Sequence, residues 1–232
     1  MTALADAIRE KGHWRIVVRP ATYVPDRIPY ASLQQTVEKS VVQLRGWDFP
    51  HLDRQGGARH GNDWVGGETD WSYYKETWRF SVSGQFVYLV GIHEDWVEDF
   101  KVGFAAHGLP TAGSWLGVGD TLFRCTEIFE FAARLALTDA GEDRMSIEVD
   151  IRNAEARRLW VDSPSRMPMD NQYEFHDRVL VYRKEIDRAE LAGRSREHAA
   201  EAAADIFARF GWHPELSLLK GQQAELRWGR RS

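Results

Sequence analysis

Apolar and polar residues alternate along several segments of the chain. A two-residue period predicts β-strands, and a Ser-Gly dipeptide between two such runs predicts a tight hairpin. The predicted strands are 13–20, two strands within 75–94 that turn at Ser83-Gly84, and three later segments at 144–153, 156–162 and 173–185. A further short strand is predicted around Trp64, inside a polar, glycine-rich stretch.

Other segments repeat their apolar residues every three to four positions, which predicts amphipathic helices. The predicted helices are 3–11, 32–45, 121–138 and 195–210, with short helical segments at 94–102 and 216–226. Ser32 with Gln35 forms a capping-box pattern, and Asp120 is placed to cap the helix that follows it.

Two predicted helices are followed by the same pattern of residues. Gly46-Trp47 is followed by Pro50, and Gly211-Trp212 is followed by Pro214. Glycine accepts the positive φ that ends many helices, and the apolar residue after it folds back on the last turn. We therefore interpret both glycine-tryptophan pairs as structural devices that end a helix.

The order of these elements predicts the fold class. Strands occur in hairpins, and too few helices lie between them for a parallel sheet. We predict an α+β fold, with an antiparallel sheet built from hairpins and about three main helices packed on one face. Residues 1–232 are predicted to form one domain. A helix followed by three strands occurs twice, so a second interpretation is two related halves, 13–118 and 119–228.

The amino-acid composition indicates which classes of protein and site are compatible with this chain. Hydrophobic residues make up 43% and charged residues 28% of the 232 residues, which is typical of a folded globular chain. The net charge of −5 argues against a broad surface for phosphate backbones. No long apolar run or signal segment is present, so we expect a cytoplasmic protein without a membrane span. Cys125 is the only cysteine, which excludes disulfides and cysteine-based zinc sites.

The tryptophan content, in contrast, is unusual for a globular chain. The chain has ten tryptophans, and six of them lie between positions 47 and 115. Tryptophan combines a large apolar ring with an N–H donor, and it is enriched at the energetic centres of protein interfaces. The residues predicted to bind a partner or ligand are Trp64, Trp71, Trp96, Trp115, Arg45 and Asp48.

A metal site is the alternative use of the glycine-rich stretch. Imidazole and carboxylate groups are ligand types for zinc, manganese or iron, and the candidates here are His51, Asp53, His60 and Asp63. Glu148 and Asp150, on one face of a predicted strand, could add acids to a hydrolytic centre. The spacing matches no established metal motif, and the same residue types are common in turns. No phosphate-binding loop or nucleophile elbow is present, and no cofactor is expected.

Several segments within 13–135 carry a family resemblance. The most specific are Arg45-Gly46-Trp47-Asp48 with Phe49-Pro50-His51, and Trp78 with Ser83-Gly84-Gln85-Phe86. This region resembles the N-terminal part of uncharacterised bacterial proteins that carry a Schlafen-type AlbA domain or a helix-turn-helix further on. The resemblance implies an accessory or sensing module in a bacterial regulatory or antiviral defence system. It transfers no catalytic residues, because nucleic acid is handled by the other domain of those proteins.

The sequence therefore leads to a functional hypothesis with two rivals. We expect a non-catalytic module that binds a partner protein through a tryptophan-rich surface, within a nucleic-acid-associated complex reached through that partner. A homo-oligomer is compatible with the same surface. The first rival is a metal-dependent hydrolase or nuclease that uses the His51–Asp63 loop. The second is direct nucleic-acid binding by base stacking on exposed tryptophans.

Overall fold

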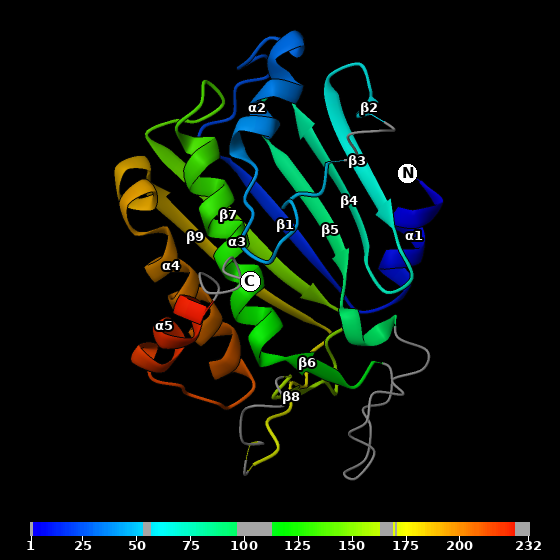
Figure 1. Cartoon of the computed structure of the whole chain (residues 1–232), viewed down its shortest axis with the longest axis vertical. Coiled ribbons are helices and arrows are strands. Elements are labelled where there is room, and N and C mark those ends of the chain that lie inside the picture. Colours follow the sequence, from blue (N-terminus) through cyan, green and yellow to red (C-terminus); the bar gives the residue numbers. More distant parts are fainter. Residues whose placement is uncertain (1, 53–56, 97–112, 163–168, 170, 226–232) are drawn as a thin grey trace.

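One antiparallel sheet runs through the computed structural model, which describes residues 2–52, 57–96, 113–162, 169 and 171–225 (Figure 1). The sheet has seven strands in the order β2-β3-β4-β5-β1-β7-β9. Its strands are β1 (His13–Pro20), β2 (Arg59–His60), β3 (Trp64–Asp70), β4 (Lys75–Ser81), β5 (Phe86–Gly91), β7 (Arg144–Arg152) and β9 (Val179–Asp187). With five helices beside it, this sheet confirms the predicted α+β fold.

The first strand of the chain lies near the middle of the sheet. Trp14 of β1 is opposite Val90 of β5 on one side and opposite Ile151 of β7 on the other. β1 therefore joins the strands formed by the first half of the chain to those formed by the second half. Buried side chains from both parts of the sheet belong to one hydrophobic core.

Helices cover one face of this sheet, and a short helix lies on the other. The α-helices are α1 (Ala3–Glu10), α2 (Leu33–Ser40), α3 (Val118–Ala136), α4 (Arg188–Arg209) and α5 (Leu216–Glu225). α2, α3 and α4 lie over the face that carries Trp14, Phe80 and Tyr88, as the three main helices were predicted to do (Figure 1). α1 lies against β4 and β5 on the opposite face. No helix in the described part of the chain is long and apolar enough to cross a membrane.

Two of the later predicted strands differ from the structure. The segment predicted at 156–162 forms only β8 (Arg158–Trp160), which pairs in parallel with β6 (Trp115–Gly117) outside the main sheet. The strand predicted from position 173 begins at Val179, because the residues before it contact β8 through a bridge between Arg158 and Glu174. Local alternation does not reveal which strand a segment will pair with.

The predicted helix at 32–45 is wrong in its second half. α2 ends at Ser40, and Val41 has extended dihedral angles (φ −54°, ψ 137°). Beyond it, the amide of Val42 donates to the carbonyl of Phe49 at 3.0 Å, and the Phe49 amide donates back at 2.8 Å. These bonds close a small loop, and Gly46 (φ +90°) turns the chain inside it. The interpretation of Gly46 and Trp47 as a helix-ending device is therefore incorrect.

The equivalent interpretation of Gly211 is correct. Gly211 has φ +88°, and its amide donates to the carbonyl of Ala208 at 2.9 Å. The amide of Trp212 donates to the carbonyl of Phe207 at 3.1 Å, and the two rings lie 5.0 Å apart. This pattern of bonds ends α4 with a left-handed residue and an apolar contact.

The starts of the two longest helices also differ from prediction. α3 begins at Val118, so Asp120 lies in its first turn and does not cap it. α4 begins at Arg188, before the predicted start at 195, and has a kink at Arg194 (φ −136°). The predicted segment at 94–102 begins with a 3₁₀ turn, η2 (His93–Asp95), and its remainder from position 97 lies outside the described residues.

Two glycines, Gly193 within α4 and Gly211 just after its end, make a matched test of this fold. Gly211→Ala places a side chain at positive φ and should lower the free energy of unfolding by about 1 kcal/mol. Gly193→Ala, where an added Cβ contacts nothing within 4 Å on an exposed turn of helix, should raise it by about 0.5–1 kcal/mol. Urea unfolding of both variants measures the changes, and effects of equal sign would contradict the assignment.

Candidate functional site

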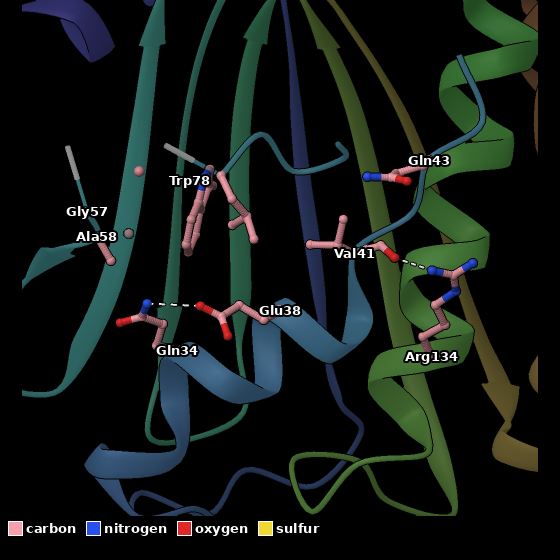
Figure 2. A pocket seen from close by; sticks show the side chains of 11 residues that line it. Gln34, Glu38, Val41, Gln43, Gly57, Ala58, Trp78 and Arg134 are labelled. Atoms are coloured by element: carbon pink, nitrogen blue, oxygen red, sulfur yellow. Dashed lines mark hydrogen bonds between the residues drawn. The ribbon is translucent and has the colours of Figure 1, made fainter. Parts of the chain in front are cut away.

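A groove lies between β3 and the segment 41–52 that follows α2. It consists of two adjoining cavities of about 580 and 600 Å³, which share Gln43 and Leu52 in their walls. Figure 2 shows the first cavity, where Trp78 lies between β3 and α2, and Arg134 of α3 donates to the carbonyl of Val41. The second cavity lies beside the last residues of β3 and is lined by aromatic and acidic side chains.

The second cavity is lined by Trp47, His51 and Trp71, and the Tyr74 ring contacts Trp47 and Trp71. We call these four side chains the aromatic notch. The ring of His51 meets Trp71 edge-on at 4.6 Å, and Tyr74 lies 6.3 Å from Trp47 and 6.0 Å from Trp71. Trp47 and Trp71 keep 41% and 52% of their surfaces exposed. Two large indoles are therefore held beside a cavity without being buried in the core.

A buried ion pair holds Trp47 in this position. Arg45 donates from Nε to Glu127 at 2.9 Å and from Nη2 to the other oxygen of the same carboxylate at 2.7 Å. Arg45 also donates to Asp120 of α3, and its guanidinium lies over the Trp47 ring at 5.2 Å. Burial alone would lower the pKa of Arg45, but Glu127 and Asp120 raise it above its usual value. The segment 41–52 is thus fixed to α3 by a charged, bidentate contact.

The same geometry holds the Asp120 carboxylate ionised. Burial tends to raise the pKa of Asp120, but the neighbouring Arg45 and Arg124 lower it to about 2. Glu127 is fully buried and lies 3.7 Å from Arg124 as well. Two guanidinium groups and two carboxylates therefore balance one another beneath the notch.

A second buried acid fixes the backbone at His51. Glu76 accepts hydrogen bonds from the His51 amide at 2.9 Å, the Tyr74 hydroxyl at 2.7 Å and the Tyr88 hydroxyl at 2.5 Å. Burial raises the pKa of Glu76, and these bonds only partly oppose that change. The carbonyl of His51 accepts from Nε1 of Trp78 at 3.0 Å. Both polar backbone groups of His51 are therefore bonded to side chains of β4.

The position of Trp78 depends on a glycine in the neighbouring strand. Gly67 is paired with Trp78 across β3 and β4. A Cβ on Gly67 would lie 2.5 Å from Nε1 of Trp78, which is closer than real side chains approach. Only glycine lets the indole lie flat across β3 and reach the carbonyl of His51.

A pair of acids lies at the start of α3, near the ion pairs. Asp162 accepts from the amides of Gly119 at 2.8 Å and Asp120 at 2.7 Å, and thereby caps the helix from outside it. Glu94 accepts from Nε1 of Trp160 at 2.9 Å. Burial, together with the charges of Asp120 and Asp162, raises the pKa of Glu94 to about 7.

The residues predicted to bind a partner fall into two groups. Asp48 and Trp71 line the second cavity, whereas Arg45 lines neither cavity and lies against the Trp47 ring. The other tryptophans predicted for this role do not line either cavity. Each is half-buried against other side chains: Trp64 under Arg79 at 4.2 Å, Trp96 under Lys11 at 4.3 Å and Trp115 against Trp160 at 6.4 Å.

The predicted metal ligands have other contacts. His60 is hydrogen-bonded to the Tyr30 hydroxyl at 3.1 Å, while His51 contacts Trp71. Asp63 is exposed at the start of β3, and Asp53 lies outside the described residues. Within residues whose positions are described, no three His, Cys, Asp or Glu side chains are grouped to hold a metal ion. The hydrolase hypothesis therefore gains no geometric support from the described residues.

The acids proposed to assist hydrolysis are part of a charged ladder on the sheet. Glu148 pairs with Arg15 at 2.5 Å and with Arg183 at 2.7 Å, and Asp150 pairs with Arg152 at 2.8 Å. Opposite charges on neighbouring strands stabilise the open face of a sheet. These contacts are structural.

Three residues of the site were not predicted from the sequence. Trp47 was assigned to the end of a helix, while Tyr74 and Glu76 were assigned no role. Glu76 does carry a signal, because it occupies the same phase of the β4 alternation as Trp78 and Phe80. An acid at a core-facing position of a strand is costly unless it is hydrogen-bonded, so it marks a buried polar site.

Removing one member of the Arg45–Glu127 pair should destabilise the fold strongly. Arg45→Met leaves Glu127 buried with a weaker partner and should cost about 3 kcal/mol or more. The double variant Arg45→Met/Glu127→Leu should recover most of that loss, because no unpaired acid remains. Urea unfolding measures both, and a double variant as unstable as the single one would show that the charge pairing is unimportant.

Glu94 should make stability depend on pH. Its pKa is higher in the folded state, about 7 against 4.5 in an unfolded chain, so ionisation opposes folding. The free energy of unfolding should therefore fall as pH rises from about 4.5 to about 7, by up to about 3 kcal/mol.

The variant Glu94→Gln should then be more stable than the wild type at pH 8 and nearly equal to it at pH 5. Exposed Glu10→Gln on α1 removes the same charge and serves as the control. Urea unfolding at the two pH values measures the difference, and equal effects of the two variants would contradict the role of Glu94.

No family model, curated protein or solved structure matches the chain. The resemblance to the N-terminal part of bacterial proteins with AlbA-type domains therefore stays a prediction. The function must be inferred from the groove itself.

Proposed function

We propose that the chain is a non-catalytic interaction module that binds a partner protein in the groove, with the aromatic notch as its energetic centre. One observation carries the proposal: Trp47 and Trp71 remain about half exposed beside a cavity of about 600 Å³. Large aromatic side chains that a fold holds in water are common anchors of protein interfaces.

The rigidity of the notch supports the same function. Trp47 lies beside the Arg45–Glu127 pair, and the backbone of His51 is bonded to Glu76 and Trp78. Side chains that are already ordered lose little conformational entropy when a partner binds. The buried polar network thus favours tight recognition by the exposed rings.

The contacts of the acidic side chains in the groove also support a binding role over a catalytic one. Glu38 accepts from Gln34, Asp48 from Gln43, and Glu68 pairs with Arg59 at 2.8 Å. These contacts position the walls of the groove. They give each of these carboxylates a structural task.

The biological setting of the proposal rests on the sequence resemblance. A module of this kind would serve a bacterial regulatory or antiviral defence system in the cytoplasm. Nucleic acid would be reached through the partner, because a chain of net charge −5 is a poor binder of phosphate backbones. A homo-oligomer would place two grooves on one assembly.

The proposal is tested by comparing variants in capture from a lysate of the source organism. Trp47→Ala and Trp71→Ala should each weaken binding of one captured protein by about 30-fold or more, as expected for hot-spot residues. Tyr23→Ala is the control, because Tyr23 is 74% exposed and does not line the groove. Quantitative mass spectrometry after nuclease treatment measures capture, and thermal melting verifies that each variant is folded.

Two outcomes would contradict the proposal. A protein captured equally by the wild type and both tryptophan variants would bind elsewhere. Capture that disappears after nuclease treatment would favour direct nucleic-acid binding.

A further inference from the structure

Two arginines face the same pair of acids beneath the aromatic notch. Nη2 of Arg45 lies 2.7 Å from Oε2 of Glu127, and Nη1 of Arg124 lies 3.7 Å from that same oxygen. At Asp120, Oδ1 lies 2.5 Å from Nη1 of Arg45 and 4.0 Å from Nη2 of Arg124. Arg45 therefore contacts both carboxylates, while Arg124 lies farther from each of them.

Arg124 has few hydrogen-bond acceptors for a buried guanidinium. Its Nη1 donates to the Tyr88 hydroxyl at 3.3 Å, and its buried Nε has no acceptor among the described residues. A guanidinium has five N–H donors, and buried donors without acceptors are unfavourable. The two carboxylates that Arg45 contacts would supply acceptors that Arg124 lacks.

The spacing of residues on α3 places both acids within reach of Arg124. Asp120 lies four positions before Arg124 and Glu127 lies three positions after it, so the three side chains share one face of the helix. A change of side-chain rotamer can therefore bring Arg124 closer to either acid. Arg45 comes from outside α3 and reaches the acids only while its segment lies against that helix.

The loop that carries Arg45 is closed at its neck. The backbone bonds between Val42 and Phe49, at 3.0 and 2.8 Å, join the two ends of the loop. Gly46 turns the chain at the tip with φ +90°, and a Cβ added there would contact nothing within 4 Å. The space beside the tip is therefore open, and residues 43–48 can turn about the neck while its two bonds remain.

A second cation beside the acids lowers the cost of detaching Arg45. Removing the partner of a buried carboxylate is strongly unfavourable, because the acid is left without a countercharge. Here Arg124 can approach both acids as Arg45 leaves. While Arg45 is in place, the like charges of the two guanidiniums oppose that approach.

We propose that Arg124 is a reserve partner for Glu127 and Asp120, which lets Arg45 detach and the tip of its loop move away from α3 as a latch. In either arrangement the two acids keep a cation. The inference concerns a movement of the fold, and it holds whether or not the groove binds a protein.

The latch has an engaged and a released arrangement. In the engaged arrangement, which is the one described above, Arg45 contacts both acids and Trp47 completes the aromatic notch. In the released arrangement, Arg124 contacts both acids and Trp47 leaves the notch. The notch is thus a surface that the protein can assemble and dismantle.

The crystal structure of the variant Arg45→Met tests where Arg124 moves. Without Arg45, the Arg124 guanidinium should approach Glu127 and Asp120 to within about 3 Å, the distance of a hydrogen bond. Its contact with the Tyr88 hydroxyl should be lost at the same time. An Arg124 that keeps its present distances from both acids would overturn the inference.

Relaxation dispersion of nitrogen-15 tests the movement in the wild type, so this measurement does not require a destabilised variant. Nε of Arg45, which donates to Glu127, and Nε1 of Trp47 should exchange at one common rate in the microsecond-to-millisecond range. Arg124→Met should reduce the released population by at least about tenfold, because release would then leave both acids without a cation.

Two further variants complete the comparison. Arg196→Met is the matched control, because Arg196 pairs with Glu130 elsewhere on α3 at 2.6 Å, and it should leave the exchange of Arg45 unchanged. Arg124→Lys keeps the charge but cannot contact both acids at once, so it should give a smaller reduction and replaces Arg124→Met if that variant does not fold. Thermal melting verifies that each variant is folded.

The dispersion measurement has two outcomes that overturn the inference. Arg45 that shows no exchange in the wild type, or the same exchange in the Arg124 variant, has no reserve partner. If Arg196→Met changes the exchange as much as Arg124→Met does, looser packing of α3 explains the movement and the reserve role of Arg124 fails.

Discussion

The bidentate contact between Arg45 and Glu127 is the constraint on which the rest of the site depends. It joins a segment after α2 to the middle of α3, across 82 positions of the chain, where Glu127 is fully buried and Arg45 is largely buried. A buried ion pair adds little net stability, because desolvation offsets much of the attraction. Its effect is on geometry: a guanidinium with two parallel bonds to one carboxylate has a single acceptable orientation. That orientation determines where Trp47 lies.

The groove follows from this fixed segment. Because the chain after Ser40 must reach α3 with Arg45 and return to the sheet with Phe49, it cannot continue as a helix. The returning chain is then bonded at His51 to Glu76 and Trp78 of β4. The segment therefore crosses the helix-covered face at a distance from β3, and the space between them is the groove. Rigid walls with exposed indoles are what a recognition surface requires.

Among the described residues, β2 pairs with β3 only at Val65 and Gly66. Sheet edges tend to pair with any available strand, and proteins commonly protect them with charged residues. At the edge of β3, Glu68 pairs with Arg59 at 2.8 Å and Asp70 pairs with Lys75.

The sequence by itself determined the fold class and most of the secondary structure. The alternation in β1, β4, β5 and β7 and the apolar periodicity of α3 are local patterns. Each arises because one face of the element is buried, so the sequence alone predicts it. Glycine ended α4 as expected because the bonds at Gly211 are local as well. Only the tertiary structure decided where α2 ends and which tryptophans gather at the groove. Arg45 and Glu127 are 82 positions apart. A contact at that separation overrides the local helical preference, and the sequence around either residue does not indicate it.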